Sequence, residues 1–301
     1  MDVYLPIANL SVNGLWIVAL GGLTGILSGL FGVGGGFLTT PLLIFYGVPP
    51  TVAAASASTQ VTGASVTGVI AHNTRGGVDY RMGAVMIGGG VIGSGFGALL
   101  FNFFRSIGQI DVVINALYVI LLGSIGLLMA KESIELLRGD PSRQVARRRH
   151  HPLVASLPMR WRFYKSGLYI SPLAPLLVGV VVGILTMLMG VGGGFILVPA
   201  MLYILGMSAN VVVGTSLFNI LFVTMATTIM HSLTTKAVDI VLVFLLLLGS
   251  VSGAQIGSQI AVKAKPEVLR LILAAIVLII AFRMFLGLFY QPDEIYTLSP
   301  L

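Results

Sequence analysis

Long apolar runs, separated by short polar connections, dominate the pattern of this chain. No Lys, Arg, Asp or Glu occurs from Val3 to Thr74 or from Ser166 to Thr235. A membrane-spanning helix needs about 20 apolar residues, so each run is long enough for several spans. The pattern predicts an all-α, polytopic membrane protein. The predicted segments are Leu15–Phe31, Phe37–Tyr46, Thr51–Asn73, Arg81–Phe104 and Asp111–Ala130 in the first half, and Leu173–Met189, Phe195–Leu205, Ala209–Ser232, Ile240–Val262 and Val268–Phe289 in the second.

A six-residue run occurs twice and divides the chain into two related halves. Gly32–Phe37 recurs letter for letter as Gly190–Phe195, and each copy is followed four residues later by a proline. Further landmarks recur at nearly the same spacing, namely His72 and His231, Asp79 and Asp239, and the pair Gly93 and Gly97 with Gly253 and Gly257. Repeated landmarks of this kind indicate a tandem duplication. We expect a first repeat over residues 1–130, a connector over 131–170 and a second repeat over 171–301.

The second apolar segment of each half is unusually short. About ten residues of helix span roughly 15 Å, which is half of a hydrocarbon core of about 30 Å. Such a segment either completes a crossing or turns back, and each repeat then has an odd number of true crossings. Two such repeats insert in opposite orientations. The sequence therefore predicts two inverted-topology repeats, each with about five hydrophobic segments and with broken or half helices near the bilayer midplane.

Charge and composition exclude several classes of protein. The chain is 56% hydrophobic and 9% charged, which is unlike a soluble globular domain. Of the net charge of +7, six units lie between Lys131 and Lys165, where nine basic residues face three acidic ones. A basic connector between apolar halves is expected in the cytoplasm, where it also meets anionic lipid. This predicts a multi-pass protein of the cytoplasmic (inner) membrane, with lipid rather than nucleic acid as its partner.

The repeated glycine run is the first candidate site. Consecutive glycines interrupt a helix and leave backbone groups free, which lipid allows only where protein or water covers them. The first amides of the helix that follows have no intrahelical partner and lie at the positive end of its dipole, so they attract anions. Glycine pairs at four-residue spacing elsewhere are expected to be helix contacts. We predict that both runs bind substrate through Gly34, Gly35, Gly36, Gly192, Gly193 and Gly194.

Polar residues in the third segment of each half form the second candidate group. Gln60 and Asn219 lie about ten residues into their segments, which is close to the expected midplane. A side-chain amide at that depth needs a partner, and it can donate to the oxygens of an anion. The alternative is that these residues tie neighbouring helices together. The candidate substrate ligands are Ser58, Gln60, Thr215, Ser216 and Asn219.

The matched pair His72 and His231 falls near the far end of the third segments. A histidine there is either a proton acceptor in a coupled or gated transporter or an interfacial cap, because its pKa of about 6.5 lies close to neutrality. Asp79 and Asp239 come at the start of the next helices, where a carboxylate favours the N-terminus. We expect both aspartates to be caps.

The duplicated Gly-Val-Gly-Gly-Gly-Phe run with its following proline, the His-then-Asp spacing and the small-residue helices resemble the TauE/SafE family of sulfite and organosulfonate exporters. The resemblance covers nearly the whole chain. It implies a bacterial or archaeal inner-membrane permease for small sulfur-containing anions, with the glycine runs and third-segment polar residues as its site. Gly214-Thr215-Ser216 is closer to the family pattern than Ala55-Ser56-Ala57-Ser58.

Taken together, these features predict a secondary transporter of small sulfur-containing anions. The alternative is a cation-selective or proton-conducting channel, which would favour membrane-embedded carboxylates. A membrane enzyme is disfavoured, since there is no cysteine, no HExxH motif and no acidic pair. We expect no cofactor and no metal. The glycine-rich helices offer a face for a homodimer.

Overall fold

The computed structural model describes residues 2–31, 34–74, 76–137, 160–263 and 266–289. Its elements are β1 (Asp2–Leu5), β2 (Leu10–Asn13), α1 (Gly14–Phe31), α2 (Gly36–Phe45), α3 (Pro50–Thr74), α4 (Tyr80–Ser106), α5 (Ile110–Leu137), β3 (Trp161–Phe163), β4 (Leu168–Ile170), α7 (Leu173–Met189), α8 (Gly194–Pro199), the π-helix η2 (Ala200–Ile204), α9 (Ala209–Met230), the π-helix η3 (His231–Thr235), α10 (Ile240–Lys263) and α11 (Pro266–Phe289). Each predicted apolar segment is helical, and α5 differs most, since it continues beyond Ala130 to Leu137.

The all-α membrane architecture is confirmed. Within the described residues, five helices are long and apolar enough to cross a membrane, and they lie in α4, α5, α9, α10 and α11. The shorter apolar helices are α1, α2, α7 and the continuous stretch Gly194–Ile204. Pro199 ends the α-helical part of that stretch, and the π-helix η2 follows. A proline lacks the amide that continues the α-helical pattern, which accounts for the change of helix type at this point.

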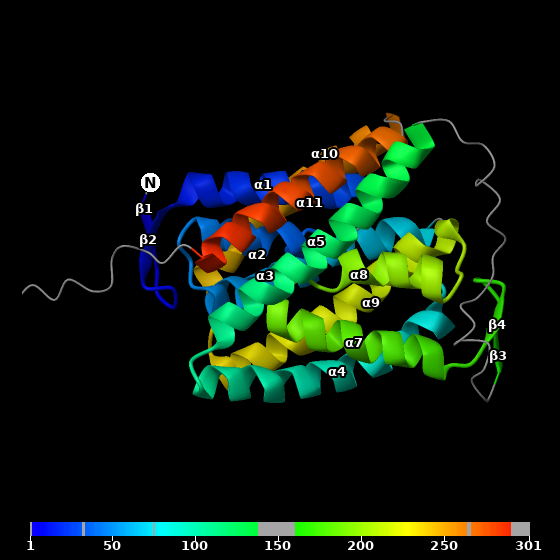
Figure 1. Ribbon diagram of the computed structural model, residues 1–301, viewed down its shortest axis with the longest axis horizontal. Coiled ribbons are helices and arrows are strands. Elements are labelled where there is room, and N and C mark those ends of the chain that lie inside the picture. The colour runs from blue at the N-terminus through cyan, green and yellow to red at the C-terminus, as the bar shows by residue number, and fades with distance from the viewer. Residues whose placement is uncertain (1, 32–33, 75, 138–159, 264–265, 290–301) are drawn as a thin grey trace, which may run out of the picture.

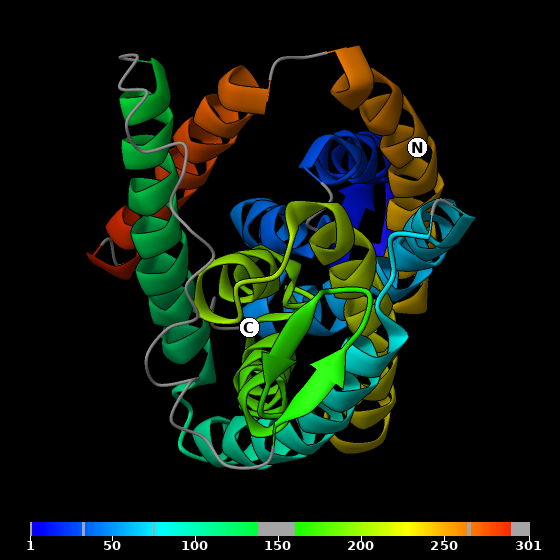
Figure 2. The same cartoon turned by 90° about the vertical axis from the view of Figure 1, so that its right-hand side faces the viewer.

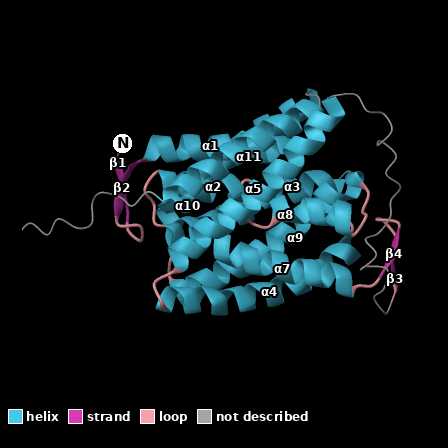
Figure 3. Cartoon of the chain, in the orientation of Figure 1, coloured by secondary structure: helices cyan, strands magenta, loops and turns pink. Residues whose placement is uncertain are grey.

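Two small β-hairpins at opposite ends of the molecule were not predicted. β1 pairs antiparallel with β2, and β3 pairs antiparallel with β4. Figure 3 shows the first hairpin at one end of the helical bundle and the second at the other. The second hairpin lies inside the predicted connector 131–170. Its residues Phe163 and Ile170 are buried, so this part of the connector packs onto the helices.

Small residues bring the helices of two pairs into close contact. α1 packs along α10, and α4 packs along α7. A β-carbon on Gly183 would collide with the carbonyl oxygen of Gly90, and one on Gly253 would collide with that of Gly22. Glycine at these positions lets two backbones approach, as predicted for Gly21, Gly25, Gly93, Gly97, Gly179, Gly183, Gly253 and Gly257. The same contact, predicted for Gly29, stays a prediction. Figure 2 shows α5 with α11 on one side of the bundle and α10 with α1 on the other.

The short helix α2 turns back to the end from which α1 began. One buried cluster joins Leu5 and Val12 of the first hairpin, Ile17 at the start of α1 and Leu43 near the end of α2. The second half has the same arrangement at the opposite end. There, Phe163 and Ile170 of the second hairpin, Ala174 at the start of α7 and Leu205 after η2 share one cluster. Each half therefore begins with a helical hairpin that enters from one end of the bundle and returns to it (Figure 1).

Candidate functional site

Both glycine runs interrupt the helical backbone inside the protein. In the second run, Gly190 ends α7 with a φ of 74°, and Gly192 and Gly193 have φ of 72° and 74° before α8 begins. In the first run, Gly34 has a φ of 74° before α2 begins, while residues 32–33 lie outside the described part of the chain. These left-handed conformations favour glycine because a β-carbon would be strained there. All six predicted glycines are buried.

The two interruptions meet at the centre of the molecule. Phe37 and Phe195, one residue into each short helix, stack with ring centroids 4.7 Å apart and planes inclined by 10°. A β-carbon on Gly36 would lie 3.0 Å from the carbonyl oxygen of Gly190. The first helical bonds after each break are donated by the amides of Leu38 and Ile196. The amides that precede them in each helix therefore lie at this meeting point.

Helices α3 and α9 form the walls around the two breaks. A β-carbon on Gly34 would lie 3.6 Å from Ile220 Cδ1 and 3.7 Å from Val61 Cγ1. One on Gly192 would meet the same two side chains, at 3.2 Å from Ile220 Cγ2 and 2.6 Å from Val61 Cγ1. Val61 of α3 and Ile220 of α9 therefore both lie against the two glycine runs. Gln60 and Asn219 come directly before these two residues in sequence.

Three of the predicted polar ligands are buried and have polar atoms without a hydrogen-bond partner. Ser58, Gln60 and Asn219 are 0%, 1% and 0% exposed. Ser58 Oγ, Gln60 Oε1 and both Oδ1 and Nδ2 of Asn219 lack a partner. Most buried polar groups are hydrogen-bonded, because an unpaired one costs about 1–3 kcal/mol. Helices α3 and α9 therefore carry buried polar groups that remain available to a ligand.

Thr215 and Ser216, the other two predicted ligands, have partners within the protein. The amide of Asp79 donates to Thr215 Oγ1 at 2.9 Å, and Ser216 Oγ donates to the carbonyl oxygen of Val213 at 2.9 Å. The first half has a matching contact that was not predicted, since the amide of Asp239 donates to Ser56 Oγ at 3.1 Å. Aligning the two halves places Ser56 opposite Thr215, which is the sequence signal for this pair.

The two aspartates cap their helices, as expected, and also hold the β-hairpins. Asp79 Oδ1 accepts from the amide of Met82 in α4, and its Oδ2 accepts from the amide and hydroxyl of Ser166, in the turn between β3 and β4. Asp239 Oδ1 accepts from the amide of Leu242 in α10, and its Oδ2 accepts from the amide of Ile7, in the turn between β1 and β2. Each aspartate thus binds the hairpin that precedes the other half.

His231 lies in the interior rather than at an exposed interface. Its side chain is 0% exposed, and its Nε2 lies 3.0 Å from the carbonyl oxygen of Met187, in the last turn of α7. Tyr118 donates to the carbonyl oxygen of Met189 in the same turn, at 2.7 Å. These two side chains bind carbonyls that the end of α7 leaves without helical partners. His72 lies in the last turn of α3, and its side chain is outside the described residues.

The described residues contain no group of three or more His, Cys, Asp or Glu side chains that could hold a metal ion. The chemistry at the centre consists of backbone amides, amide side chains and hydroxyl groups, which bind by hydrogen bonds.

Comparisons with known proteins give a consistent result. A sequence model of the family described as sulfite exporter TauE/SafE matches residues 17–284. The probable membrane transporter protein YjnA of Bacillus subtilis (strain 168) is 27% identical over 266 residues, which cover 87% of this chain and 96% of that protein. A probable membrane transporter protein of Xylella fastidiosa (strain Temecula1) is 27% identical over 268 residues, covering 88% of this chain and 92% of that protein. No solved structure matches the chain significantly.

Proposed function

Because this chain belongs to the sulfite exporter TauE/SafE family, we propose that it is a secondary transporter of small sulfur-containing anions, such as sulfite or short organosulfonates. The family and the apolar helices indicate a multi-pass membrane transporter. The substrate class and the binding site are the proposal. The anion binds where the two glycine runs meet, between α3 and α9.

The observation that carries this proposal is the set of buried, unpaired polar groups on α3 and α9, the two helices whose side chains contact the breaks. Asn219 Nδ2 and Ser58 Oγ are hydrogen-bond donors, and rotation of the Gln60 side chain exchanges its oxygen and its NH2. A bound oxyanion supplies the acceptors that these donors lack. The starts of α2 and α8 add backbone amides at the positive ends of their dipoles. A site without a buried lysine or arginine binds an anion with moderate affinity. This suits a transporter, because it must also release its substrate.

The same geometry supports two repeats of opposite orientation. The α1–α2 hairpin enters from the end that carries β1–β2, whereas the α7–α8 hairpin enters from the end that carries β3–β4 (Figure 1). Asp79 and Asp239 form reciprocal contacts across the halves. In the proposed topology the β3–β4 end, with Arg81, Arg162 and Lys165, faces the cytoplasm of the inner membrane.

The remaining predicted residues take secondary roles in this proposal. Thr215 positions the start of α4, and Ser216 bonds to its own helix. His231 holds the end of α7 beside the second glycine run, so a change of its protonation would alter that end and gate the site. His72 is its counterpart in the first half, and proton coupling through either residue stays a prediction.

The proposal is tested with purified protein in liposomes. Wild-type protein should carry sulfite and sulfoacetate across the membrane, and the same anions should raise its thermal stability, since a ligand that binds the folded state stabilises it. Ser58→Ala should abolish both effects. Ser250→Ala is the matched control, because Ser250 is also buried and unpaired but lies on α10 against α1. Transport of the zwitterion taurine in preference to these anions would contradict the proposed site.

A further inference from the structure

The two β-hairpins have the same attachment to the protein but different charge. Each is held by three buried apolar side chains and by an aspartate from the other half; the side chains are Leu5, Ala8 and Val12 in the first hairpin and Phe163, Leu168 and Ile170 in the second. Residues 2–13 contain one charged residue, Asp2, whereas residues 160–170 contain three basic residues. The first hairpin shows that this fold and this attachment need no basic residues, so the cations of the second hairpin are not required for its attachment.

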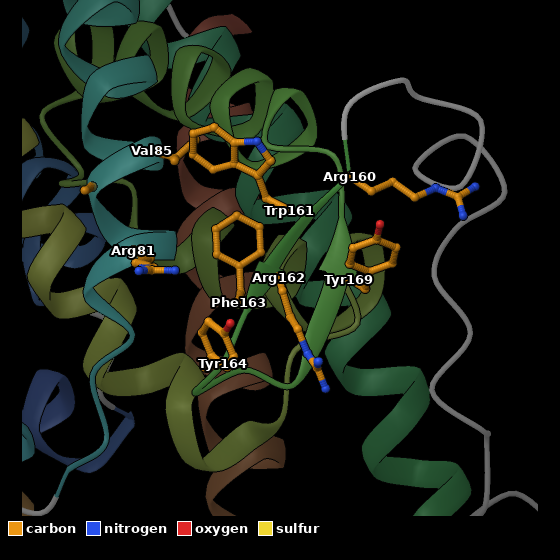
Figure 4. A pocket seen from close by; sticks show the side chains of 9 residues that line it. Arg81, Val85, Arg160, Trp161, Arg162, Phe163, Tyr164 and Tyr169 are labelled. Carbon is orange, nitrogen blue, oxygen red and sulfur yellow. The ribbon is translucent and has the colours of Figure 1, made fainter.

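Arg160 and Arg162 of this hairpin and Arg81 of α4 line a pocket that also has aromatic walls. The guanidinium carbon of Arg81 lies 5.6 Å from the centre of the Tyr164 ring, and that of Arg162 lies 5.7 Å from the same ring. Lys165 Nζ lies 5.5 Å from the centre of the Tyr80 ring. Figure 4 shows Tyr164 between Arg81 and Arg162, with Trp161 directed toward Val85 of α4. Two arginines from separate elements thus converge on one exposed tyrosine.

The nearby carboxylate of Asp79 is turned away from the surface. Asp79 is 3% exposed, and its oxygens accept from Met82 and Ser166. By contrast, two aromatic residues of the pocket reach the surface, since Trp161 and Tyr164 are 53% and 71% exposed. Exposed aromatic rings next to basic side chains are typical of the interface between a membrane and water.

An apolar strip of α4 continues from the pocket along the outside of the bundle. Ala84, Gly88, Ile92 and Phe96 are exposed and lie four residues apart, as on one face of a helix, and Val91 is exposed beside Ile92. A β-carbon on Gly88 would meet nothing within 4 Å, so the strip is open next to the pocket. A basic pocket that leads into an apolar strip matches a phospholipid, whose charged headgroup is joined to acyl chains, better than a small soluble anion.

We propose that this pocket binds the headgroup phosphate of an anionic phospholipid such as phosphatidylglycerol. Arg81 and Arg162 contact the phosphate oxygens, because a guanidinium presents paired donors that match a phosphate. Trp161 and Tyr164 lie at the level of the headgroup, and one acyl chain follows the α4 strip. The site is independent of the proposed central anion site, so either proposal can fail without the other.

The chain contains two tryptophans, which provide a direct test. In a Trp16→Phe variant, Trp161 alone reports on the pocket. In nanodiscs of phosphatidylcholine with increasing phosphatidylglycerol brominated on its acyl chains, Trp161 should be quenched at lower mole fractions than with brominated phosphatidylcholine. The reverse variant, Trp161→Phe, reports on the first hairpin through Trp16, which is 63% exposed and should show no such preference.

Charge variants separate a specific site from general surface attraction. Arg162→Gln should raise the half-quenching fraction about fivefold, and Arg81→Gln with Arg162→Gln about thirtyfold. Lys131→Gln removes an equal charge from an exposed position in α5 and should leave quenching unchanged. Arg81→Lys with Arg162→Lys keeps the charge but loses paired donation, and quenching should again weaken.

Three results would overturn the proposal. They are equal effects of Lys131→Gln and Arg162→Gln, full retention of phosphatidylglycerol preference by the double lysine variant, and complete displacement of the lipid by excess inorganic phosphate. The first two would indicate diffuse attraction, and the third a soluble-anion site. Unchanged thermal unfolding of each variant in neutral detergent shows that its fold is intact.

Discussion

Replacing Asn219 by leucine should make the protein more stable and inactive at the same time. Asparagine and leucine have the same branching of heavy atoms, so the substitution keeps the shape of the side chain. Asn219 is 0% exposed, and neither its Oδ1 nor its Nδ2 has a partner. Each unpaired buried group costs about 1–3 kcal/mol, and the leucine removes both. Its larger methyl groups cost about 1–3 kcal/mol in a packed interior.

The net expectation is that Asn219→Leu raises the free energy of unfolding by about 1–3 kcal/mol in the absence of substrate. This is measured by thermal or denaturant unfolding of the purified protein in detergent. Sulfite at about one hundred times its Kd should add about 2.7 kcal/mol to the stability of the wild-type protein and nothing to that of the variant. Sulfite flux in liposomes should be lost.

Two outcomes would refute this reasoning. A variant that is less stable than the wild type would show that the Asn219 amide has a partner in the folded protein and serves its structure. A stable variant with normal sulfite flux would show that the amide does not contact the substrate. Asn219→Asp is a useful companion, because the added carboxylate should repel the anion and also reduce stability.

Three further predictions concern the elements that support the site. Gly183→Ala should destabilise the protein, because its β-carbon would collide with the Gly90 carbonyl oxygen. Gly123→Ala in α5 is the control: a β-carbon there meets nothing within 4 Å, so this variant should be neutral or more stable by up to about 1 kcal/mol. Thermal unfolding of the two variants tests the difference. Tyr118→Phe should cost about 1–3 kcal/mol, since the Met189 carbonyl oxygen loses its donor, and an unchanged unfolding temperature would contradict this contact. Asp79→Asn should weaken both the α4 cap and the β3–β4 attachment by about 1–2 kcal/mol in total, and should speed proteolysis near Lys165; equal proteolysis of variant and wild type would argue against the attachment.

The apolar pattern alone was sufficient to predict the helices. Membrane helices are long and uniformly apolar, so their ends are marked by polar residues or glycines, as at Ser106, the last residue of α4, and Gly190, which follows α7. The duplication then identified the two breaks, because consecutive glycines are visible in the sequence and interrupt a helix. Asp79 and Asp239 were predicted as caps because capping depends on residues three positions apart in sequence.

The tertiary structure decided the features that depend on distant residues. The strands of three or four residues are too short for a periodic pattern, and their attachment comes from aspartates of the other half. The partner of Thr215 is 136 residues away, so the sequence could not separate it from Asn219 as a candidate ligand. The lack of partners around Ser58, Gln60 and Asn219 is likewise a property of the packed helices. Residue type determines which hydrogen bonds a side chain can make. Only the packing of the helices determines which of its groups remain unpaired and available to a ligand.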